Sequence, residues 1–323
     1  MRTKIVYVLI SDENDYFTEM VLLSVYSLRL YHPDNLVELA TDQNTLSYLK
    51  NQSSPLLEQA HAIVVETPSK YNKFQRSRYI KTNLRRHIDG RFLYLDCDTL
   101  VCGKLDEIDY VEDDVAFSYH NDGALLRKKD SMTSVGFQKP KGKHKINFNG
   151  GVFFANDTPA AYAFFDMWSL LWQKSAKYEI APDQPALFQT IINLHYPVHE
   201  LPGGGIWNCQ ILSGSSRPYL KKALIYHYYS NVASESRQSL WEHLRNSKSS
   251  DNVIQLVISH PRTVGYLFLF MTDSRIKCIQ ETGLIQMYEN NPAVMKRILP
   301  LCSKLFGPIQ SLIWKVSRFF VNK

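Results

Sequence analysis

The sequence has few cysteines, and none is spaced in a way that suits a metal or a disulfide framework. Five cysteines are scattered over 323 residues, and no two form a Cys-x-x-Cys pair. This number and spacing of cysteines argue against a secreted fold held together by disulfides and against a zinc site built on thiolates. It is typical of a protein from a reducing, cytoplasmic compartment.

Long apolar runs are also missing. The nearest approach to transmembrane length, residues 253–271, is interrupted by His260-Pro261-Arg262. Near the start, six apolar residues separate Lys4 from Ser11, which is too short for the apolar part of a signal peptide. We therefore expect a cytoplasmic protein without a spanning helix.

Acidic residues are absent from the carboxyl-terminal end. Residues 1–230 carry 25 basic and 25 acidic side chains, whereas residues 231–323 carry 12 and 6, so the net charge of +6 falls in the second part. Within residues 294–323, apolar side chains recur on one helical face. Such basic, amphipathic segments could bind an anionic membrane surface, or they could pack on the rest of the chain or on a partner. Nucleic-acid binding is not expected, because basic and aromatic residues alternate in only one short segment.

The first 230 residues alternate between two kinds of segment. Strand-like apolar runs and helix-like periodic segments follow one another, at 4–10, 17–31, 36–41, 62–66 and 74–87. This order predicts a Rossmann-like α/β fold, with a mostly parallel central sheet and helices on both faces. Ligands of such sheets bind beyond the carboxyl ends of the strands. The pattern changes after residue 230, so we predict one α/β domain over 1–230 and a basic, mainly helical region over 231–323.

Two carboxylates follow the next apolar run, residues 92–95. Because side chains alternate along a strand, Asp96 and Asp98 should point the same way. Two neighbouring carboxylates repel each other at neutral pH. A divalent cation between them would remove that repulsion and could then hold a diphosphate. Since Asp-x-Asp also occurs in ordinary polar loops, the interpretation depends on the other motifs.

Four further motifs accompany Asp-x-Asp, and together they resemble the GT-A nucleotide-sugar glycosyltransferases, most of all family 8, the glycogenin and lipopolysaccharide galactosyltransferase group. The resemblance spans roughly residues 4–230 and rests on 11–16, 77–79, 96–98, 148–153 and 182–184. It implies transfer of a hexose, glucose or galactose, from a UDP-sugar to a hydroxyl acceptor such as a glycan or a lipid-linked saccharide. It also implies a divalent metal and retention at the anomeric carbon.

The loop after the first strand resembles the family's nucleotide loop. Asp12 and Asn14 can bond the edge of a uracil, and Tyr16 can stack on its face. The alternative is an ordinary Asp/Asn turn after a strand.

Several polar residues are candidates for holding the sugar or the diphosphate. Arg78 and Lys81 lie about one turn apart on the same side of a helix and could reach either group. Asn149 precedes Gly150, where the absence of a side chain lets a ligand approach the backbone. Asp183 would grip a sugar hydroxyl. The alternatives are a solvated basic face, a glycine turn entering a strand, and a helix cap at Asp183.

Gln184 has no such structural explanation. The resemblance places it near the reacting face, where with Asp183 and Arg78 it makes up the expected catalytic group. A glutamine is a poor nucleophile, so attack by the acceptor on the same face is the more natural mechanism. Trp207 and Asn208 could wall the sugar pocket, or the tryptophan could simply anchor a glycine-rich loop.

His227 ends a short apolar run that begins at Leu224. The resemblance implies that it is the third ligand, beside Asp96 and Asp98, of Mn²⁺ or Mg²⁺, and an imidazole with two carboxylates suits Mn²⁺ well. The alternative is a histidine with a structural role. After His227 the family has a glycine, a lysine and then Pro-Trp, whereas this chain continues with residues 228–233 and has no phosphate-binding lysine there. A loop with lysines at four alternate positions could replace it as a lid, at Lys139, Lys141, Lys143 and Lys145.

Three other functions compete with this interpretation. A haloacid-dehalogenase-like phosphatase needs threonine or valine four residues after its first aspartate, and Leu100 occupies that place. A nucleotidyltransferase would have a glycine-rich, basic loop after the first strand, but residues 11–16 are acidic and contain no glycine. A non-catalytic sugar-nucleotide-binding protein stays open, because the phosphate-binding lysine is missing. Between the two interpretations of residues 294–323 we favour the inner face of a membrane, because a lipid-linked acceptor would be found there.

Removing residues 294–323 tests that preference. We expect the shortened protein to be released from anionic vesicles while hydrolysis of a soluble donor continues, because the predicted site lies within 1–230. Co-sedimentation with anionic vesicles measures the binding. If the shortened and complete chains bind such vesicles equally well, the membrane interpretation is wrong.

Overall fold

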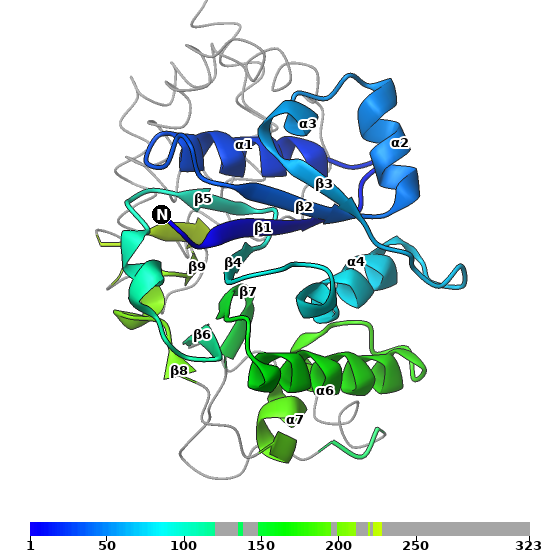
Figure 1. Ribbon diagram of the computed structural model, residues 1–323. Helices are drawn as coiled ribbons and strands as arrows, with labels where there is room; N and C mark the ends of the chain where they lie inside the picture. Colours follow the sequence, from blue (N-terminus) through cyan, green and yellow to red (C-terminus); the bar gives the residue numbers. More distant parts are fainter. Residues whose placement is uncertain (120–134, 138–147, 195–198, 211–218, 220–221, 228–323) are drawn as a thin grey trace, which may run out of the picture. The chain divides into compact units, whose positions relative to one another are not determined.

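The computed structural model describes residues 1–119, 135–137, 148–194, 199–210, 219 and 222–227 (Figure 1). The chain divides into two compact units, 1–231 and 232–323, and the described residues all belong to the first. The expectations for residues 231–323 and for the four loop lysines therefore concern residues outside those described. They stay predictions, as does the division at residue 230.

The described residues form one large sheet and one small one. The seven strands of the large sheet lie in the order β3-β2-β1-β4-β7-β6-β8. Their bounds are Lys4–Leu9 (β1), Val37–Thr41 (β2), His61–Val64 (β3), Phe92–Leu95 (β4), Val115–Tyr119 (β6), Phe148–Ala155 (β7) and His199–Glu200 (β8). Only β7 runs against its neighbours β4 and β6, whereas all other pairs in this sheet are parallel. This confirms the predicted, mostly parallel sheet.

The small sheet brings together segments that are far apart in the sequence. Its strands are β5 (Thr99–Val101), β10 (Ile225–His227) and β9 (Cys209–Gln210), with β10 in the middle. β10 is antiparallel to β5 and parallel to β9. Because β5 follows β4 after three residues, this sheet places the end of β10 beside the carboxyl end of β4.

Helices cover both faces of the large sheet, as predicted. The α-helices are Phe17–Arg29 (α1), Gln43–Asn51 (α2), Leu56–Gln59 (α3), Lys73–Thr82 (α4), Pro159–Ala176 (α6) and Gln184–Leu194 (α7). Short 3₁₀ turns add Leu84–Arg86 (η1), Asp106–Tyr110 (η2) and Gly204–Ile206 (η4). Figure 1 shows α1 on one side of the sheet and α4 and α6 on the other.

The alternation of side chains along β1 explains this arrangement. The hydroxyl of Tyr7 is 2.8 Å from that of Ser24, which places this face of β1 against α1. Val6 and Val8 belong to the hydrophobic core on the opposite face, together with Ile80 of α4 and Trp168 of α6. β1 is therefore apolar on both faces, as expected of a central strand with helices on either side.

Several helices begin where the sequence supplies a capping side chain. The Asp42 side chain accepts from the backbone N–H of Thr45 at the start of α2, and Thr158 caps α6 in the same way. Asn72 and Gln75 cap each other reciprocally at the start of α4, as a capping box. This cap fixes the first turn of α4, the helix that carries the predicted site residues Arg78 and Lys81.

The core under α6 is mostly aromatic. Phe153 of β7 packs 5.6 Å from Trp168, measured between ring centroids, and Phe117 of β6 packs 5.3 Å from Phe153. The two tryptophans of α6 also bind the segment before α7. The Trp168 indole N–H donates to the carbonyl of Asp183 at 3.2 Å, and that of Trp172 donates to the carbonyl of Ala181 at 2.9 Å. Buried tryptophans usually satisfy their N–H in this way, and here the bonds fix the approach to α7.

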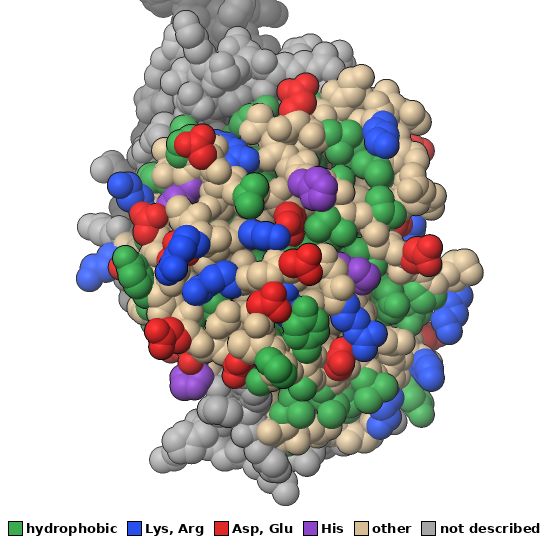
Figure 2. Space-filling model, in the orientation of Figure 1, with side chains coloured by type: hydrophobic (Ala, Val, Ile, Leu, Met, Phe, Trp, Pro, Cys, Tyr) green, Lys and Arg blue, Asp and Glu red, His purple; other side chains and the backbone are tan. Residues whose placement is uncertain are grey.

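The described surface carries charges of both signs. Figure 2 shows lysine and arginine side chains mixed with aspartate and glutamate over the visible face. This agrees with the balanced charge of residues 1–230. Among the described residues, no helix combines the length and apolarity needed to cross a membrane.

Asp109 in η2 binds the chain's amino-terminal segment. Its carboxylate accepts from the backbone N–H groups of Arg2 and Thr3, at 2.7 and 2.8 Å, and from the Thr3 hydroxyl at 2.7 Å. Burial raises the pKa of Asp109, but these hydrogen bonds favour the charged form more strongly and leave the pKa below its ordinary value of 3.8.

Replacing Asp109 with asparagine should therefore destabilise the chain in a pH-dependent way. We expect a loss of about 1–3 kcal/mol in unfolding free energy at pH 6, where the carboxylate is charged in both states. Because the pKa is lower in the folded chain, the contribution of Asp109 is complete above 3.8 and is lost as the pH falls through the folded value. Urea unfolding of both proteins near pH 6 and pH 3 measures this. A difference that did not shrink at the lower pH would contradict the prediction.

Candidate metal centre

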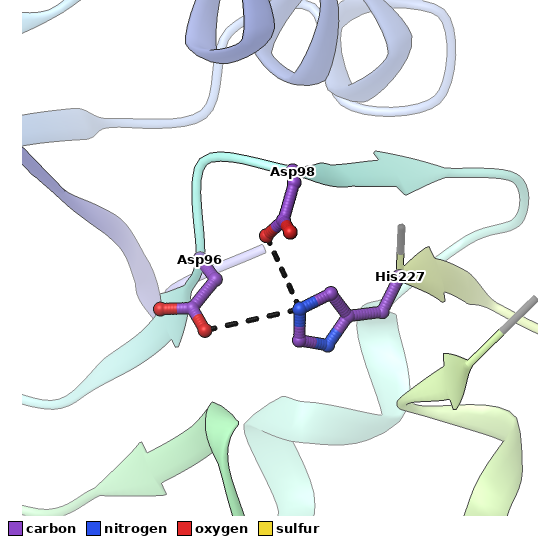
Figure 3. A group of neighbouring side chains, drawn as sticks. All are labelled: Asp96, Asp98 and His227. Carbon is purple, nitrogen blue, oxygen red and sulfur yellow. Dashed lines mark ion pairs between the residues drawn. The ribbon is translucent and has the colours of Figure 1, made fainter. Parts of the chain in front are cut away.

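One short loop and one strand end bring Asp96, Asp98 and His227 together (Figure 3). Asp96 follows β4, and its backbone N–H bonds to the carbonyl of Gly151 in β7 at 2.8 Å. Asp98 precedes β5, and His227 ends β10 opposite Thr99 of β5. One ligand atom from each of the three lies within 4.8 Å of the other two. Among the described residues, this is the group of acidic and histidine side chains that could hold a metal ion.

The imidazole of His227 faces both carboxylates through Nε2. This atom is 3.1 Å from Asp98 Oδ1 and 3.8 Å from Asp96 Oδ2. A nitrogen lone pair and a carboxylate oxygen repel at such distances unless a proton or a metal ion is shared between them. Burial lowers the pKa of His227, but the charges of Asp98 and Asp96 outweigh burial and raise it above 6.5. The cluster therefore attracts a positive charge, as a proton or as a cation.

The donor set fits a divalent cation. Two carboxylate oxygens and one imidazole nitrogen are ligands that Mn²⁺ accepts readily, and the carboxylates alone would also suit Mg²⁺. His227 is almost fully buried, whereas Asp96 and Asp98 are partly exposed. A cation held there would thus have protein on one side and an approach for a ligand on the other.

Asp96 is oriented by two donors that lie outside the cluster. The hydroxyl of Tyr94 donates to its Oδ1 at 2.6 Å, and the Lys81 ammonium donates to the same oxygen at 3.2 Å. These bonds leave Oδ2 as the oxygen that faces His227. Burial raises the pKa of Asp96, but the positive charge of Lys81, followed by those of His227 and Arg78, lowers it from 3.8 to about 2. Asp96 is therefore a carboxylate across the physiological pH range.

Lys81 connects Asp96 to a second acidic residue, Asp183. Its ammonium is 3.1 Å from Asp183 Oδ2 and lies 4.9 Å from the centre of the Tyr94 ring, and only 2% of its side chain is exposed. Arg78, three residues earlier on α4, places Nε 3.4 Å from Asp183 Oδ1. The structure thus places Arg78, Lys81 and Asp183 in one group beside the carboxylate of Asp96.

Gln184, the first residue of α7, is bonded to the backbone of β7. Its Oε1 accepts from the N–H of Gly150 at 3.1 Å, and its Nε2 donates to the carbonyl of Phe148. Both ends of the amide therefore hold the first residues of β7, where Asn149 and Gly150 lie.

Asn149 and Gly151 lie directly beside the cluster. Asn149 Oδ1 accepts from the backbone N–H of Gly151 at 2.6 Å and from Asn208 Nδ2 at 2.9 Å. A Cβ on Gly151 would overlap the Cε1 atom of His227 and would lie 2.8 Å from Asp96 Oδ2. Only glycine leaves room for the imidazole at this position.

Trp207 and Asn208 have different surroundings. The Trp207 side chain is fully buried and donates from its indole N–H to the carbonyl of Pro202 at 2.5 Å, as an aromatic anchor of the loop would. Asn208 is also buried, and its Oδ1 lies 2.8 Å from Nδ1 of His227. Asn208 is thus in contact with a predicted metal ligand.

The loop after β1 contains the predicted base-binding residues. Asp12 accepts from the backbone N–H of Asn14 at 2.8 Å, which closes a short turn before Tyr16. Its other oxygen is 2.9 Å from the ammonium of Lys73, which also binds Asp15. The loop is therefore connected to α4, the same helix that carries Arg78 and Lys81.

Sequence reasoning missed two residues of this site. Tyr94 lies two positions before Asp96, so the alternation of a strand places both on the same face, and that spacing was the available signal. Lys73 begins α4 directly after the Asn72 cap, but its partners Asp12 and Asp15 lie about sixty residues earlier, and no local pattern indicates such a pairing.

Comparison with known proteins adds a likeness of fold. No protein-family model matches the chain, and no curated protein matches it in sequence. Among solved structures, a galactosyltransferase, LgtC, in complex with donor and acceptor sugar analogues is similar, with a TM-score of 0.47 and 17% identity over 77% of this chain and 96% of that one. The glycosyltransferase GlyE of Streptococcus pneumoniae has a TM-score of 0.49 and 17% identity, over 80% of this chain and 64% of that one. Mouse xyloside xylosyltransferase 1 has a TM-score of 0.47 and 12% identity, over 72% of this chain and 99% of that one. These three proteins are glycosyltransferases.

Replacing Gly151 with alanine should disrupt the metal centre. The added methyl group would displace His227 or Asp96, so we expect Mn²⁺ affinity to fall by about 10–100-fold, as for other changes around metal ligands. Isothermal titration with MnCl₂ measures this. Gly150→Ala is the matched control, because a Cβ there meets its nearest neighbour, Asp183 Oδ2, at 3.5 Å, an ordinary contact. Equal affinity of the two variants would show that the close approach at Gly151 does not matter.

Proposed function

We propose that the chain is a metal-dependent glycosyltransferase that moves a hexose, glucose or galactose, from a UDP-sugar to the hydroxyl of a glycan or a lipid-linked saccharide. The observation that carries this proposal is the cluster of Asp96, Asp98 and His227 at the carboxyl end of β4. In an α/β fold, this edge of the sheet is where ligands bind.

The charges around the cluster support a diphosphate ligand. Lys81 pairs with Asp96 and Asp183, Arg78 pairs with Asp183, and Asp98 faces His227. Three carboxylates and two cations leave one net negative charge while His227 is neutral. A divalent cation bound there reverses the sign of the site and neutralises the charge that develops on a UDP leaving group. Without such a cation the site would repel a diphosphate. This balance supports a metal-dependent donor site.

Arg78 and Lys81 could also offset the missing lysine after His227. Both cations lie on α4 within 3.5 Å of a carboxylate of the site, Arg78 at Asp183 and Lys81 at Asp96 and Asp183. An arginine can bond two phosphate oxygens at once, whereas a lysine acts as a point charge. We assign Arg78 to the phosphate or a sugar hydroxyl. The buried Lys81 would hold Asp96 and Asp183 in place.

The remaining predicted residues fit around this centre. The nucleobase would lie on the loop of Asp12, Asn14 and Tyr16, and Lys73 would hold that loop through its ion pair with Asp12. Asp183 and the amide nitrogen of Asn149 would contact the sugar. Trp207 is buried and donates to the carbonyl of Pro202, which favours its alternative role as an anchor of the glycine-rich loop.

The contacts of Gln184 bear on the stereochemistry. Because both atoms of its amide are bonded to the backbone of β7, the side chain is held in place and is not directed at a sugar carbon as a nucleophile. This argues against a covalent intermediate on Gln184. The retention that the resemblance implies would then proceed through attack by the acceptor on the face that the UDP leaves. The role of Gln184 would be to shape the sugar side of the site.

Metal-dependent release of UDP tests the proposed function. Purified protein with Mn²⁺ should release UDP from one UDP-hexose of a panel, and the release should stop when EDTA removes the metal. Asp98→Asn, which removes one charged ligand at constant size, should lower the release to the metal-free rate.

The exposed Asp89 provides the matched control, since Asp89→Asn removes the same charge away from the cluster and should leave the rate unchanged. A protein that bound UDP-sugar but released no UDP with any donor would be a binding protein, and the catalytic assignment would be wrong.

A further inference from the structure

Asn208 and His227 form a buried pair beside the proposed metal centre. Asn208 immediately precedes β9, which pairs in parallel with β10, so the two side chains come from neighbouring strands of the small sheet. Asn208 Oδ1 and His227 Nδ1 are 2.8 Å apart. Both residues are at least 95% buried, with exposures of 4% and 5%, so bulk water does not compete for this bond.

A chain of hydrogen bonds decides which atom of this pair donates. The backbone N–H of Gly151 can only donate, so the atom of Asn149 that it meets must be the acceptor Oδ1. The atom of Asn208 that meets the same oxygen must then be its donor, Nδ2. Asn208 therefore presents its carbonyl oxygen to His227, and Nδ1 of the imidazole must carry a proton.

This arrangement prepares the other ring nitrogen for a metal. With the proton on Nδ1, a neutral His227 has its lone pair on Nε2, the atom that faces Asp98 and Asp96. A hydrogen bond on the outer nitrogen fixes the tautomer and the ring orientation of a metal-binding histidine and increases its basicity. The carbonyl group of an asparagine can do this without adding a charge.

We propose that Asn208 is a positioning residue that holds His227 in the tautomer and orientation that bind the cation, and that Asn149 and Gly151 orient Asn208 in turn. This inference rests on the proposed metal-dependent function. In this proposal Asn208 orients the metal ligand His227 and does not form the wall of the sugar pocket. The proposal also explains why Asn149 and Gly151 of β7 are joined by hydrogen bonds to the asparagine that meets the imidazole.

The test compares two substitutions at residue 208. Asn208→Ala removes the acceptor for Nδ1, and we expect its Mn²⁺ affinity to fall by about 10–100-fold. Asn208→Asp keeps an acceptor but loses the donor to Asn149, and we expect its affinity to stay within about threefold of the wild type after correction for charge. Affinities are measured by the electron paramagnetic resonance signal of free Mn²⁺, with and without UDP, on the full chain.

Asn149→Asp supplies the charge correction. It adds the same negative charge close to the site, but it can still accept from Gly151 and from Asn208, so the pair of Asn208 and His227 is kept. A purely structural link between β9 and β7 would be lost equally in both variants at residue 208. Equal weakening in Asn208→Ala and Asn208→Asp would therefore overturn the proposal, as would unchanged affinity in Asn208→Ala.

A spectroscopic measurement separates failure of this inference from failure of the proposed function. In protein loaded with ¹¹³Cd²⁺ and labelled with ¹⁵N-histidine, the proposal requires coupling of the metal to Nε2 of His227 and a slowly exchanging proton on Nδ1. In Asn208→Ala that proton should exchange rapidly. If the wild type binds cation but shows coupling to Nδ1, this inference is wrong while the metal site stands. If the wild type binds neither Mn²⁺ nor Cd²⁺, the metal-dependent function is wrong as well.

Discussion

The repulsion between two carboxylates is the interaction on which the rest of this structure depends. Asp96 and Asp98 lie on the same side of one short loop and share one buried imidazole. Burying like charges is costly unless a counter-charge accompanies them. The surroundings of the site supply such positive charge. The ammonium of Lys81 pairs with Asp96, and the raised pKa of His227 favours a protonated imidazole. A cation is therefore favoured at one place, between the side chains of Asp96, Asp98 and His227.

Helix α4 supplies most of the counter-charge along the edge of the sheet. Its basic residues pair with acidic residues that follow three different strands. Lys73 binds Asp12 after β1, Arg76 binds Asp42 after β2, and Lys81 binds Asp96 after β4. Exposed ion pairs contribute little to stability, but Asp42 and Lys81 are almost fully buried, and there the loss of one partner would leave a charge uncompensated. The helix is therefore fixed both by its apolar contacts and by the polar ends of the strands that it crosses.

Backbone geometry is the second constraint. Gly151 lies so close to His227 that no side chain fits between them, and the N–H groups of Gly150 and Gly151 are bound by Gln184 and Asn149. These amide side chains preorganise the site, because they hold the backbone and the imidazole in one arrangement before a ligand binds. Polar residues that resemble sugar contacts in a sequence can thus be committed to protein partners. Gln184 and Asn208, for instance, are bonded to Gly150 and His227.

Local patterns in the sequence determined the secondary structure and the composition of the site. The apolar runs of β1, β2 and β4, the periodicity of α1 and the residues Asp96 and Asp98 after β4 could all be identified because their signals are contained within a few neighbouring residues. The polar helix α2 was missed, since its nine residues include few apolar side chains and its start depends on the capping side chain of Asp42. The resemblance to a family implied that His227 meets two carboxylates more than one hundred residues earlier, but no local pattern did. Only the tertiary structure decided that β10 pairs with β5 and that Asn208 lies behind the ring of His227. Contacts between distant segments depend on strand register and on the packing of whole elements, and neither is encoded in a local window of sequence.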